Sequence, residues 1–444
     1  MLELAGRKVL VLGLARSGRS AAAFCAAQGA AVVAADERAQ AELEPLGDLG
    51  PRVTLACGRP LPDPADFDLV VPSPGVPPAR YAGRARRVWG DVELAARALP
   101  VPIVAVTGTN GKSTVTLLVE ALLRAAGLRA EAAGNVGRPA LELVGRPLDV
   151  AVLEVSSFQL ETTERFRARV AVLLNLAPDH LDRHGSFAAY REAKARILAN
   201  QEGDDAAVLN RDDPAVWSLA GRARGRVFAF SRRGPVERGV HVDAGALVVR
   251  DGDLRVAVPL DDVPLAGNDL DNAAAALAAV AALGADPRRA AAGFARFHTL
   301  PHRCEEVARL EGVVFVNDSK ATNPHAAQGA LERFRAPILW LAGGRDKGLD
   351  FAPLRAAARG RVRKAFLLGE AAAGLEAALS GAVPCERVAD LEEGVRRAAA
   401  EARPGEVVLL SPACASFDQF ASFEERGARF RAAVAALAGR GGAA

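Results

Sequence analysis

The sequence lacks several features that would assign it to a specialised class of protein. Its five cysteines are scattered and form no Cys-x-x-Cys pair, so it predicts neither a disulfide framework nor a zinc site. It contains no run of about 18 apolar residues, and its first residues do not follow the pattern of a signal peptide. We therefore expect a reduced, cytoplasmic protein without a membrane span.

Neither sign of charge is in excess. The 444 residues carry 56 lysines and arginines against 53 acids, a formal net charge of +3, with no long basic block. This balance argues against nucleic acid or an anionic membrane as the main partner. Half of the residues are hydrophobic and a quarter are charged, which is typical of a soluble globular chain. We also expect the protein to be a monomer.

Lysine is scarce in this chain. Arginine supplies most of the positive charge, and the lysines are Lys8, Lys112, Lys194, Lys320, Lys347 and Lys364. A compact ammonium and a planar guanidinium are not interchangeable, so a retained lysine can mark a site that needs a reactive or compact cation. Lys8 and Lys364 resemble ordinary charges beside strands, which leaves four lysines as candidates.

Three successive α/β patterns predict the organisation of the chain. The first opens with a strand, a turn, a helix and a second strand that ends at Asp36, and proline-rich punctuation follows it. The second includes short alternating runs at 239–265 that predict antiparallel hairpins, and the third alternates strands and helices again. We predict an α/β fold with a Rossmann-like domain (1–92), a central P-loop ATP-binding domain with added antiparallel strands (93–298) and a Rossmann-like C-terminal domain (299–444).

The strongest motif is a glycine-rich loop between an apolar strand and a helix. It runs Gly108-Thr109-Asn110-Gly111-Lys112-Ser113-Thr114, and such loops direct backbone N–H groups at phosphates. Lys112 would reach the β- and γ-phosphates, and Ser113 would hold Mg²⁺. Val106 stands where the usual spacing has its first glycine, and the alternative is a glycine-rich turn with a chance lysine. The order of strand, turn and helix favours the phosphate loop.

A second glycine motif near the start of the chain is weaker. Residues 13–18 read Gly-Leu-Ala-Arg-Ser-Gly and lack the middle glycine of a dinucleotide fingerprint. By itself this segment therefore does not establish a nucleotide site.

Further motifs follow the phosphate loop in a fixed order. They are GNVG at 134–137, LEVSSFQL at 153–160, NLAPDHLDRH at 175–184, AKARI at 193–197, PHR at 301–303, NDSKATNP at 317–324, GGRDK at 343–347 and SPACASFDQF at 411–420. Together they resemble the Mur ligase family, whose members use ATP to join amino acids to the peptidoglycan precursor. The resemblance spans nearly the whole chain. It implies an ATP-dependent ligase that activates UDP-N-acetylmuramoyl-L-alanine as an acyl phosphate and adds D-glutamate, releasing ADP and phosphate.

The resemblance also implies where ATP and two Mg²⁺ ions bind. The implied ATP-binding residues are Gly108, Thr109, Asn110, Gly111, Lys112, Ser113, Thr114, Asn272, Arg303, Asp318 and Lys320. The implied catalytic residues are Lys112, Glu154, His180, Lys194, Arg303 and Lys320. Ser113, Glu154, His180 and Lys194 would hold the metals, and Glu154, at the end of a strand, suits an ion between two phosphates. His184, four residues after His180, is interpreted as structural.

Lys194 has a special role in the resembled enzymes, where the matching lysine carries a carbamate formed with CO₂. The modification turns a cation into an anion that helps to hold the second Mg²⁺. The alternative is a solvated lysine on the face of a helix, because Arg191 and Glu192 precede it. Its retention in a chain so poor in lysine favours the carbamate.

The two other substrates are assigned by the same resemblance. The UDP substrate would meet Leu14, Ala15, Arg16, Asp36, Arg38, Ser73, Gly75, Asn135 and His180. D-glutamate carries two carboxylates, which call for a cation and hydroxyls. The implied residues are Thr322, Lys347, Ser416, Phe417 and Phe423, although the phenylalanines could instead be part of the core.

Other functions remain open at this level. A Mur-type ligase for a different amino acid or a folylpolyglutamate synthetase would share the architecture, and the segment 411–420 and the first domain argue against them. An NAD-dependent oxidoreductase would need a better glycine fingerprint in the first domain. A non-catalytic, nucleotide-gated binding protein would have no reason to keep Glu154, His180 and Lys194 with the loop.

Overall fold

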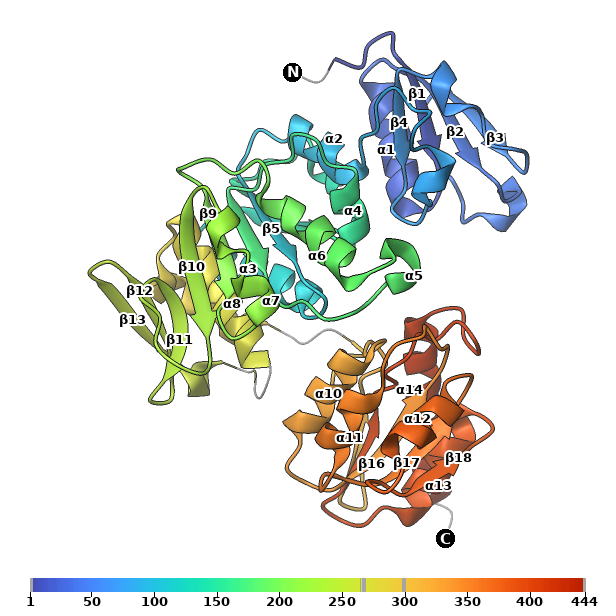
Figure 1. Ribbon diagram of the computed structural model, residues 1–444, viewed down its shortest axis with the longest axis vertical. Helices are drawn as coiled ribbons and strands as arrows, with labels where there is room; N and C mark the ends of the chain where they lie inside the picture. Colours follow the sequence, from blue (N-terminus) through green and yellow to red (C-terminus); the bar gives the residue numbers. More distant parts are fainter. Residues whose placement is uncertain (1–2, 264, 266–268, 298–300, 442–444) are drawn as a thin grey trace. The chain divides into compact units, whose positions relative to one another are not determined.

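The computed structural model describes residues 3–263, 265, 269–297 and 301–441. The described residues fall into two compact units, the first within 1–176, 183–265 and 270–297 and the second within 177–182, 266–269 and 298–444. The first unit holds two sheets and the second holds one (Figure 1). The division into three domains stays a prediction, and its boundary at residue 298 lies outside the described residues.

The first sheet has four parallel strands in the order β3-β2-β1-β4. Its strands are β1 (Lys8–Leu12), β2 (Ala31–Asp36), β3 (Val53–Cys57) and β4 (Leu69–Pro72), with helices α1 (Arg16–Ala27) and α2 (Asp91–Ala98) following β1 and β4. Gly13 has a φ of +81°, and a Cβ there would lie 3.0 Å from Cγ2 of Val76. The turn between β1 and α1 therefore requires glycine.

The second sheet has nine strands in the order β13-β12-β11-β10-β9-β8-β5-β7-β6. They are β5 (Ile103–Thr107), β6 (Ala130–Gly134), β7 (Val150–Glu154), β8 (Val170–Leu173), β9 (Ala206–Asn210), β10 (Arg226–Ser231), β11 (Gly239–Asp243), β12 (Ala246–Asp251) and β13 (Leu254–Pro259). The last three pair antiparallel, which confirms the predicted hairpins, and all other pairs are parallel. Strand order reverses at β5, and such reversals open a crevice at the carboxyl ends of the strands.

Most helices that accompany the second sheet are short, and the two long ones are α3 (Lys112–Ala125) and α8 (Asp269–Leu283). The others are α4 (Ser157–Glu161), α5 (Leu181–His184), α6 (Phe187–Ala195), α7 (Pro214–Trp217) and α9 (Pro287–Ala290). The alanine-rich helix α8 is buried among strand valines and α3, because its small side chains allow close approach. Helix α6 ends at Ala195, and a 3₁₀ turn (Arg196–Leu198) continues it.

The third sheet has six strands in the order β14-β15-β19-β16-β17-β18. They are β14 (Glu305–Leu310), β15 (Val313–Asn317), β16 (Ile338–Gly343), β17 (Val362–Leu368), β18 (Cys385–Arg387) and β19 (Val407–Leu410). All pair in parallel except β14, an antiparallel edge strand absent from the sequence-based prediction. The helices are α10 (Pro324–Arg333), α11 (Ala352–Ala358), α12 (Ala372–Leu379), α13 (Leu391–Glu401) and α14 (Phe423–Gly441).

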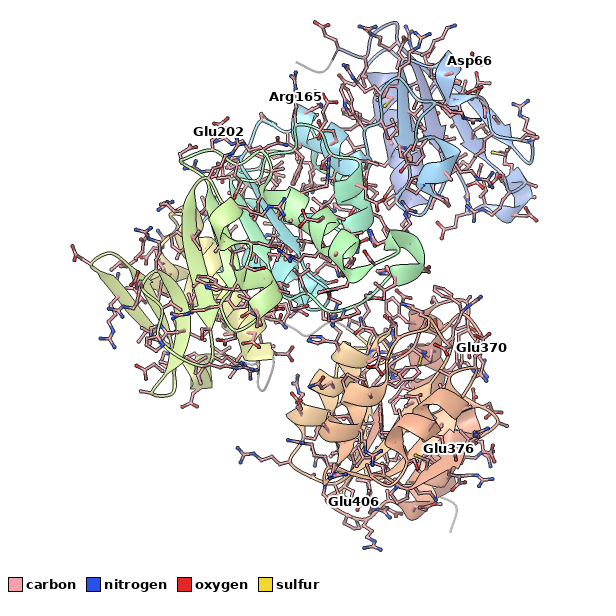
Figure 2. All side chains as sticks on the ribbon, viewed as in Figure 1. Asp66, Arg165, Glu202, Glu370, Glu376 and Glu406 are labelled. Atoms are coloured by element: carbon pink, nitrogen blue, oxygen red, sulfur yellow. The ribbon has the colours of Figure 1, made fainter. Side chains whose placement is uncertain are left out.

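Arginine and acid pairs occupy much of the surface. Glu376, labelled in Figure 2, accepts a hydrogen bond from Nε of Arg387 at 2.8 Å. Both side chains are exposed, so such a pair adds little to stability. Within the described ranges, we find no helix that is both long and apolar enough to span a bilayer.

Candidate active site

The glycine-rich loop stands at the carboxyl end of β5, at the reversal of strand order. Gly111 has a φ of +84° and precedes the first turn of α3, and a Cβ there would lie 2.3 Å from Oδ1 of Asn272. Glycine is therefore required by both the backbone and the packing. The ammonium of Lys112 donates to the carbonyls of Gly108 and Thr109, each at 3.0 Å, so the side chain folds over the loop.

Asn175, two residues after the end of β8, fixes the shape of this loop. Its Oδ1 accepts the backbone N–H of Asn110 at 2.8 Å, and its Nδ2 donates to the carbonyl of Asn110 at 3.0 Å. The backbone N–H of Thr109 donates to the carbonyl of Asn175 at 2.9 Å. Asn175 begins the motif at 175–184, but it was not among the predicted site residues. The loop is thus held in shape by the protein itself, as an anion cradle needs to be.

Glu154 ends β7 and lies opposite Val106 in the ladder with β5. Its side chain is 1% exposed, and Oε1 accepts from Nδ2 of Asn135 at 2.6 Å. Its Oε2 is buried and has no hydrogen-bond partner among the described residues. A buried carboxylate oxygen without a donor is costly unless another ligand satisfies it, and Mg²⁺ prefers oxygen ligands.

The described residues contain no group of three or more His, Cys, Asp or Glu side chains placed to hold a metal. A metal at Glu154 would therefore need ligands other than a cluster of carboxylates, imidazoles and thiolates. Phosphate oxygens, water and the Ser113 hydroxyl on the adjacent loop are suitable, because Mg²⁺ usually keeps waters and binds phosphates with only one or two carboxylates. The residues present fit a metal that arrives with a nucleotide.

Lys194 is buried beside the same loop. Its side chain on α6 is 1% exposed, and Nζ donates to the carbonyl of Gly108 at 2.8 Å and to Oγ1 of Thr107 at 3.4 Å. The alternative of a solvated surface lysine is therefore wrong. Since Lys112 donates to the same Gly108 carbonyl, two ammonium groups gather at one end of β5 and favour an anion there.

A cavity of about 790 Å³ opens at the carboxyl ends of the first sheet. Its lining includes most of the residues predicted for the UDP substrate, namely Leu14, Ala15, Arg16, Asp36, Arg38, Ser73 and Gly75. Asp36 accepts from Nε and Nη2 of Arg38 and from the backbone N–H of Leu14. The Arg38 hydrogen bond lowers the pKa of Asp36 to about 2, so this carboxylate is ionised at neutral pH. Asn135 is not among the residues that line this cavity.

His180 and Asp179 belong to the second unit. His180 has a φ of +52°, an uncommon conformation for a residue with a Cβ, and its side chain is 41% exposed. The buried Asp179 accepts from Nδ2 of Asn323 at 3.0 Å and from Nζ of Lys347 at 3.4 Å. Burial raises the pKa of Asp179, but Lys347 and His180 outweigh it and the net shift is downward. Sequence reasoning had selected Lys347 and His180 and missed Asp179 between them.

Asp318 follows β15 and is also buried in the second unit. Its Oδ2 accepts from Oγ of Ser411 at 2.8 Å, and its Oδ1 accepts from the backbone N–H of Cys304 at 3.2 Å. Burial raises the pKa of Asp318 to about 7. Two residues on, Nζ of Lys320 lies 3.8 Å from the centre of the Phe423 ring. Phe423 therefore contacts a predicted catalytic lysine.

Arg426, on α14, holds two of the predicted loops together. Its side chain is 1% exposed, and it donates to Oγ and the carbonyl of Ser319 and to the carbonyls of Cys414 and Ala415, at 2.9–3.3 Å. These loops carry Asp318 and Lys320 on one side and Ser416 on the other. Burial lowers the pKa of Arg426 to about 10, which still leaves it charged at neutral pH. No sequence signal distinguished this arginine from the many others.

The remaining predicted residues lie on the same loops of the second unit. Ser416 is buried, whereas its neighbour Phe417 is 64% exposed and so is not a core residue. Arg303 and Thr322 are partly exposed. A buried phosphate loop with a carboxylate at the adjacent strand end, combined with two further α/β layers, defines a multidomain α/β protein that handles nucleotide phosphates.

Comparisons with known proteins agree with this class. Family models described as the Mur ligase middle domain and the Mur ligase glutamate ligase domain match residues 106–283 and 302–414. A UDP-N-acetylmuramoylalanine--D-glutamate ligase of Geobacter metallireducens is 44% identical, with 98% of this chain and 99% of that protein covered. One from Anaeromyxobacter dehalogenans is 46% identical, with 97% of each chain covered. The chain belongs to the Mur ligase family, within the group of UDP-N-acetylmuramoylalanine--D-glutamate ligases.

A solved structure shares the fold at much lower identity. The pseudomurein peptide ligase type C of Methanothermus fervidus is 17% identical and superimposes with a TM-score of 0.63, covering 97% of this chain and 100% of that one. The predicted fold class is thereby confirmed. The assignment of individual site residues remains a prediction.

Proposed function

We propose that this protein is an ATP-dependent ligase that joins D-glutamate to UDP-N-acetylmuramoyl-L-alanine in peptidoglycan precursor synthesis. The observation that carries the proposal is the similarity to D-glutamate ligases over 98% of the chain. The arrangement of Lys112, Glu154 and Lys194 around one phosphate loop supports an ATP-driven reaction. We further propose that it acts as a cytoplasmic monomer on small-molecule substrates.

The first step would transfer the γ-phosphoryl group of ATP to the carboxylate of the UDP substrate. Such a transfer depends mainly on positioning and charge neutralisation. The residues Gly108 to Thr114 would bind the phosphates, with the Lys112 ammonium leaving its loop carbonyls to meet the β- and γ-phosphates. Asn272, which packs against Gly111, would contact the adenine.

Magnesium, when bound, would neutralise phosphate charge and align the transferred group. Ser113 and the unpaired Oε2 of Glu154 would hold one ion, and His180 would contribute to a second. A carbamate on Lys194 would place an anion where the structure has an ammonium beside Gly108. In that form Lys194 could contribute to the second metal as well.

The UDP moiety would occupy the cavity of the first sheet, with Asn135 and His180 reaching the part of the substrate that reacts. The loop at Gly13 and the residues Arg16, Ser73 and Gly75 would face the diphosphate and sugar. Asp36 and Arg38, already paired with each other, would present a fixed polar edge to the uracil.

D-glutamate would bind to the second unit. Lys347 supplies the cation, and Thr322 and Ser416 supply hydroxyls for its two carboxylates. Since Asp179 holds Lys347 in the structure, a substrate carboxylate would compete with Asp179 for this ammonium. Arg303 and Lys320 would stabilise the charge that develops on the transferred phosphate while the amine of D-glutamate attacks the acyl phosphate.

The deciding experiment measures phosphate release with ATP, Mg²⁺ and UDP-N-acetylmuramoyl-L-alanine across four amino acids. We expect release with D-glutamate and little with L-glutamate, meso-diaminopimelate or D-alanine. Omission of the UDP substrate is the control for uncoupled hydrolysis. Release driven by another amino acid of the panel would establish a Mur-type ligase of different specificity, and release with none would refute the proposal.

A further inference from the structure

A buried histidine near the phosphate loop has no role in the proposed reaction. His184 ends α5, and its side chain is 2% exposed. Nε2 lies 3.0 Å from Oγ of Ser157, and Nδ1 lies 3.2 Å from Oε1 of Glu161. Both partners belong to α4, the short helix that starts three residues after Glu154. Both edges of the imidazole therefore contact the helix that closely follows the candidate metal ligand Glu154.

The faces of the same ring contact aromatic side chains. Phe158 stacks on it with ring centres 5.5 Å apart, and Tyr190 meets it edge to face at 5.3 Å. Arg183 also binds Glu161, at 2.9 Å, so this carboxylate already has a positive partner. The two ring nitrogens of His184 face a carboxylate and a hydroxyl, a pair of partners that an imidazole can serve as donor at Nδ1 and acceptor at Nε2. These contacts hold the ring in position and orientation.

Tyr190 connects this ring to the phosphate loop. Its side chain is 1% exposed, and its hydroxyl lies 3.1 Å from Oγ1 of Thr109. Its ring centre lies 4.8 Å from Nζ of Lys194. The contacts thus run from α4 through His184 and Tyr190 to the Thr109 hydroxyl in the loop and to the Lys194 amine beside it. Both groups are among the residues expected to bind ATP or metal.

Hydrolytic triads also join a serine, a histidine and a glutamate by hydrogen bonds. Ser157, however, is only 3% exposed, so its hydroxyl does not face solvent. A hydroxyl on one ring nitrogen and a carboxylate on the other also serve to orient an imidazole. The burial and the two anchors point to a role in holding neighbouring groups.

We infer that His184 is a positioning residue. Anchored by Ser157 and Glu161, it fixes the ring of Tyr190, and Tyr190 in turn fixes Thr109 and the amine of Lys194 at the phosphate loop. Only an imidazole offers an in-plane donor and an in-plane acceptor on opposite edges of a small aromatic ring. A phenylalanine would fill the space and keep the aromatic contacts but would lose both anchors, and displacements of about 1 Å at a reacting centre can cost about 100-fold in rate.

The first test measures the amine of Lys194 directly and does not depend on the proposed function. Lysines are labelled with acetic anhydride for short times, and peptide mass spectrometry gives the rate at each of them. We expect His184→Phe to raise the labelling rate of Lys194 by about threefold or more through local opening. His241→Phe is the control, since His241 is a buried histidine on β11, and it should leave the rate unchanged.

The second test rests on the proposed function and uses the D-glutamate ligase assay. His184→Phe should lower kcat about tenfold while KM for D-glutamate and for the UDP substrate stays within about twofold, because the affected groups border the phosphate loop. Ser157→Ala should lower kcat less, and the double variant should be no slower than His184→Phe, since both changes remove the same hydrogen bond.

The outcomes separate the two proposals. A wild-type protein without ligase activity would refute the function and leave the labelling result to decide the role of His184. An active wild type, with His184→Phe at full rate and with unchanged Lys194 labelling, would overturn the inference. Fully additive losses in the double variant, or an equal loss in His241→Phe, would also overturn it, because they would indicate a general effect on the fold.

Discussion

The carboxyl group of Asp318 should make the stability of the second unit depend on pH in an unusual direction. Burial raises its pKa from 3.8 to about 7, and the hydrogen bonds from Ser411 and Cys304 only partly offset this shift. The folded protein therefore binds a proton at Asp318 that the unfolded chain releases above about pH 4. Unfolding free energy falls as pH rises through this window, whereas a carboxylate in an ion pair would give the opposite slope.

The size of the effect follows from the shift. Each pKa unit corresponds to about 1.4 kcal/mol, so a rise of about three units sets an upper limit of about 4 kcal/mol. Asp318→Asn removes the titration while keeping the shape of the side chain. The stability of this variant relative to the wild type should increase from pH 4 to pH 8 by about 1–4 kcal/mol and level off above pH 7. A change of that size corresponds to a widening Tm difference of several degrees.

Differential scanning calorimetry of both proteins between pH 4 and pH 8 would measure this difference. Any constant effect of the asparagine on packing cancels, because the prediction concerns only the change with pH. Asp350→Asn is the matched control for the general effect of replacing an aspartate by asparagine, since Asp350 is exposed at the start of α11. A flat difference for Asp318→Asn would refute the argument that burial keeps this carboxyl protonated.

Three further predictions concern the loops. Lys112→Ala and Glu154→Ala should each abolish phosphate release while calorimetric binding of the UDP substrate stays nearly intact; loss of that binding in both variants would contradict the division of roles between the two sheets of the first unit. Lys194→Ala should lose most activity and regain part of it with acetate, which can supply the missing negative charge. Lys194→Arg should stay inactive, because a guanidinium keeps the positive charge, and an active Lys194→Arg together with failed acetate rescue would exclude the carbamate. Arg426→Met should destabilise the second unit by about 2–4 kcal/mol, since buried carbonyls lose their donors, and thermal unfolding with an unchanged Tm would argue against the bracing role.

Elements with strong local patterns were predictable from the sequence. The strand before the phosphate loop is fully buried, and the loop requires glycine at 111 for local reasons, so both were correctly placed. Three strands at sheet edges were not. β3, β14 and β18 are only partly buried, and without a continuous apolar run or a strict alternation they resemble loops. Their identity as strands depends on a partner strand that local sequence does not reveal.

The site shows the same division between local and long-range causes. Lys112 and Ser113 follow from one short motif, whereas the burial of Lys194 depends on contact with Gly108, 86 residues away. Arg426 reaches Ser319 across 107 residues, and its four acceptors are neutral oxygens that no charge pattern could indicate. His184 had the right chemistry for a ligand, yet its burial and its bonds to Ser157 and Glu161 assign it to the support of other groups. The side-chain type of such a residue limits the roles that it can have. Which role it takes depends on its neighbours in the fold, and these neighbours are distant in the sequence.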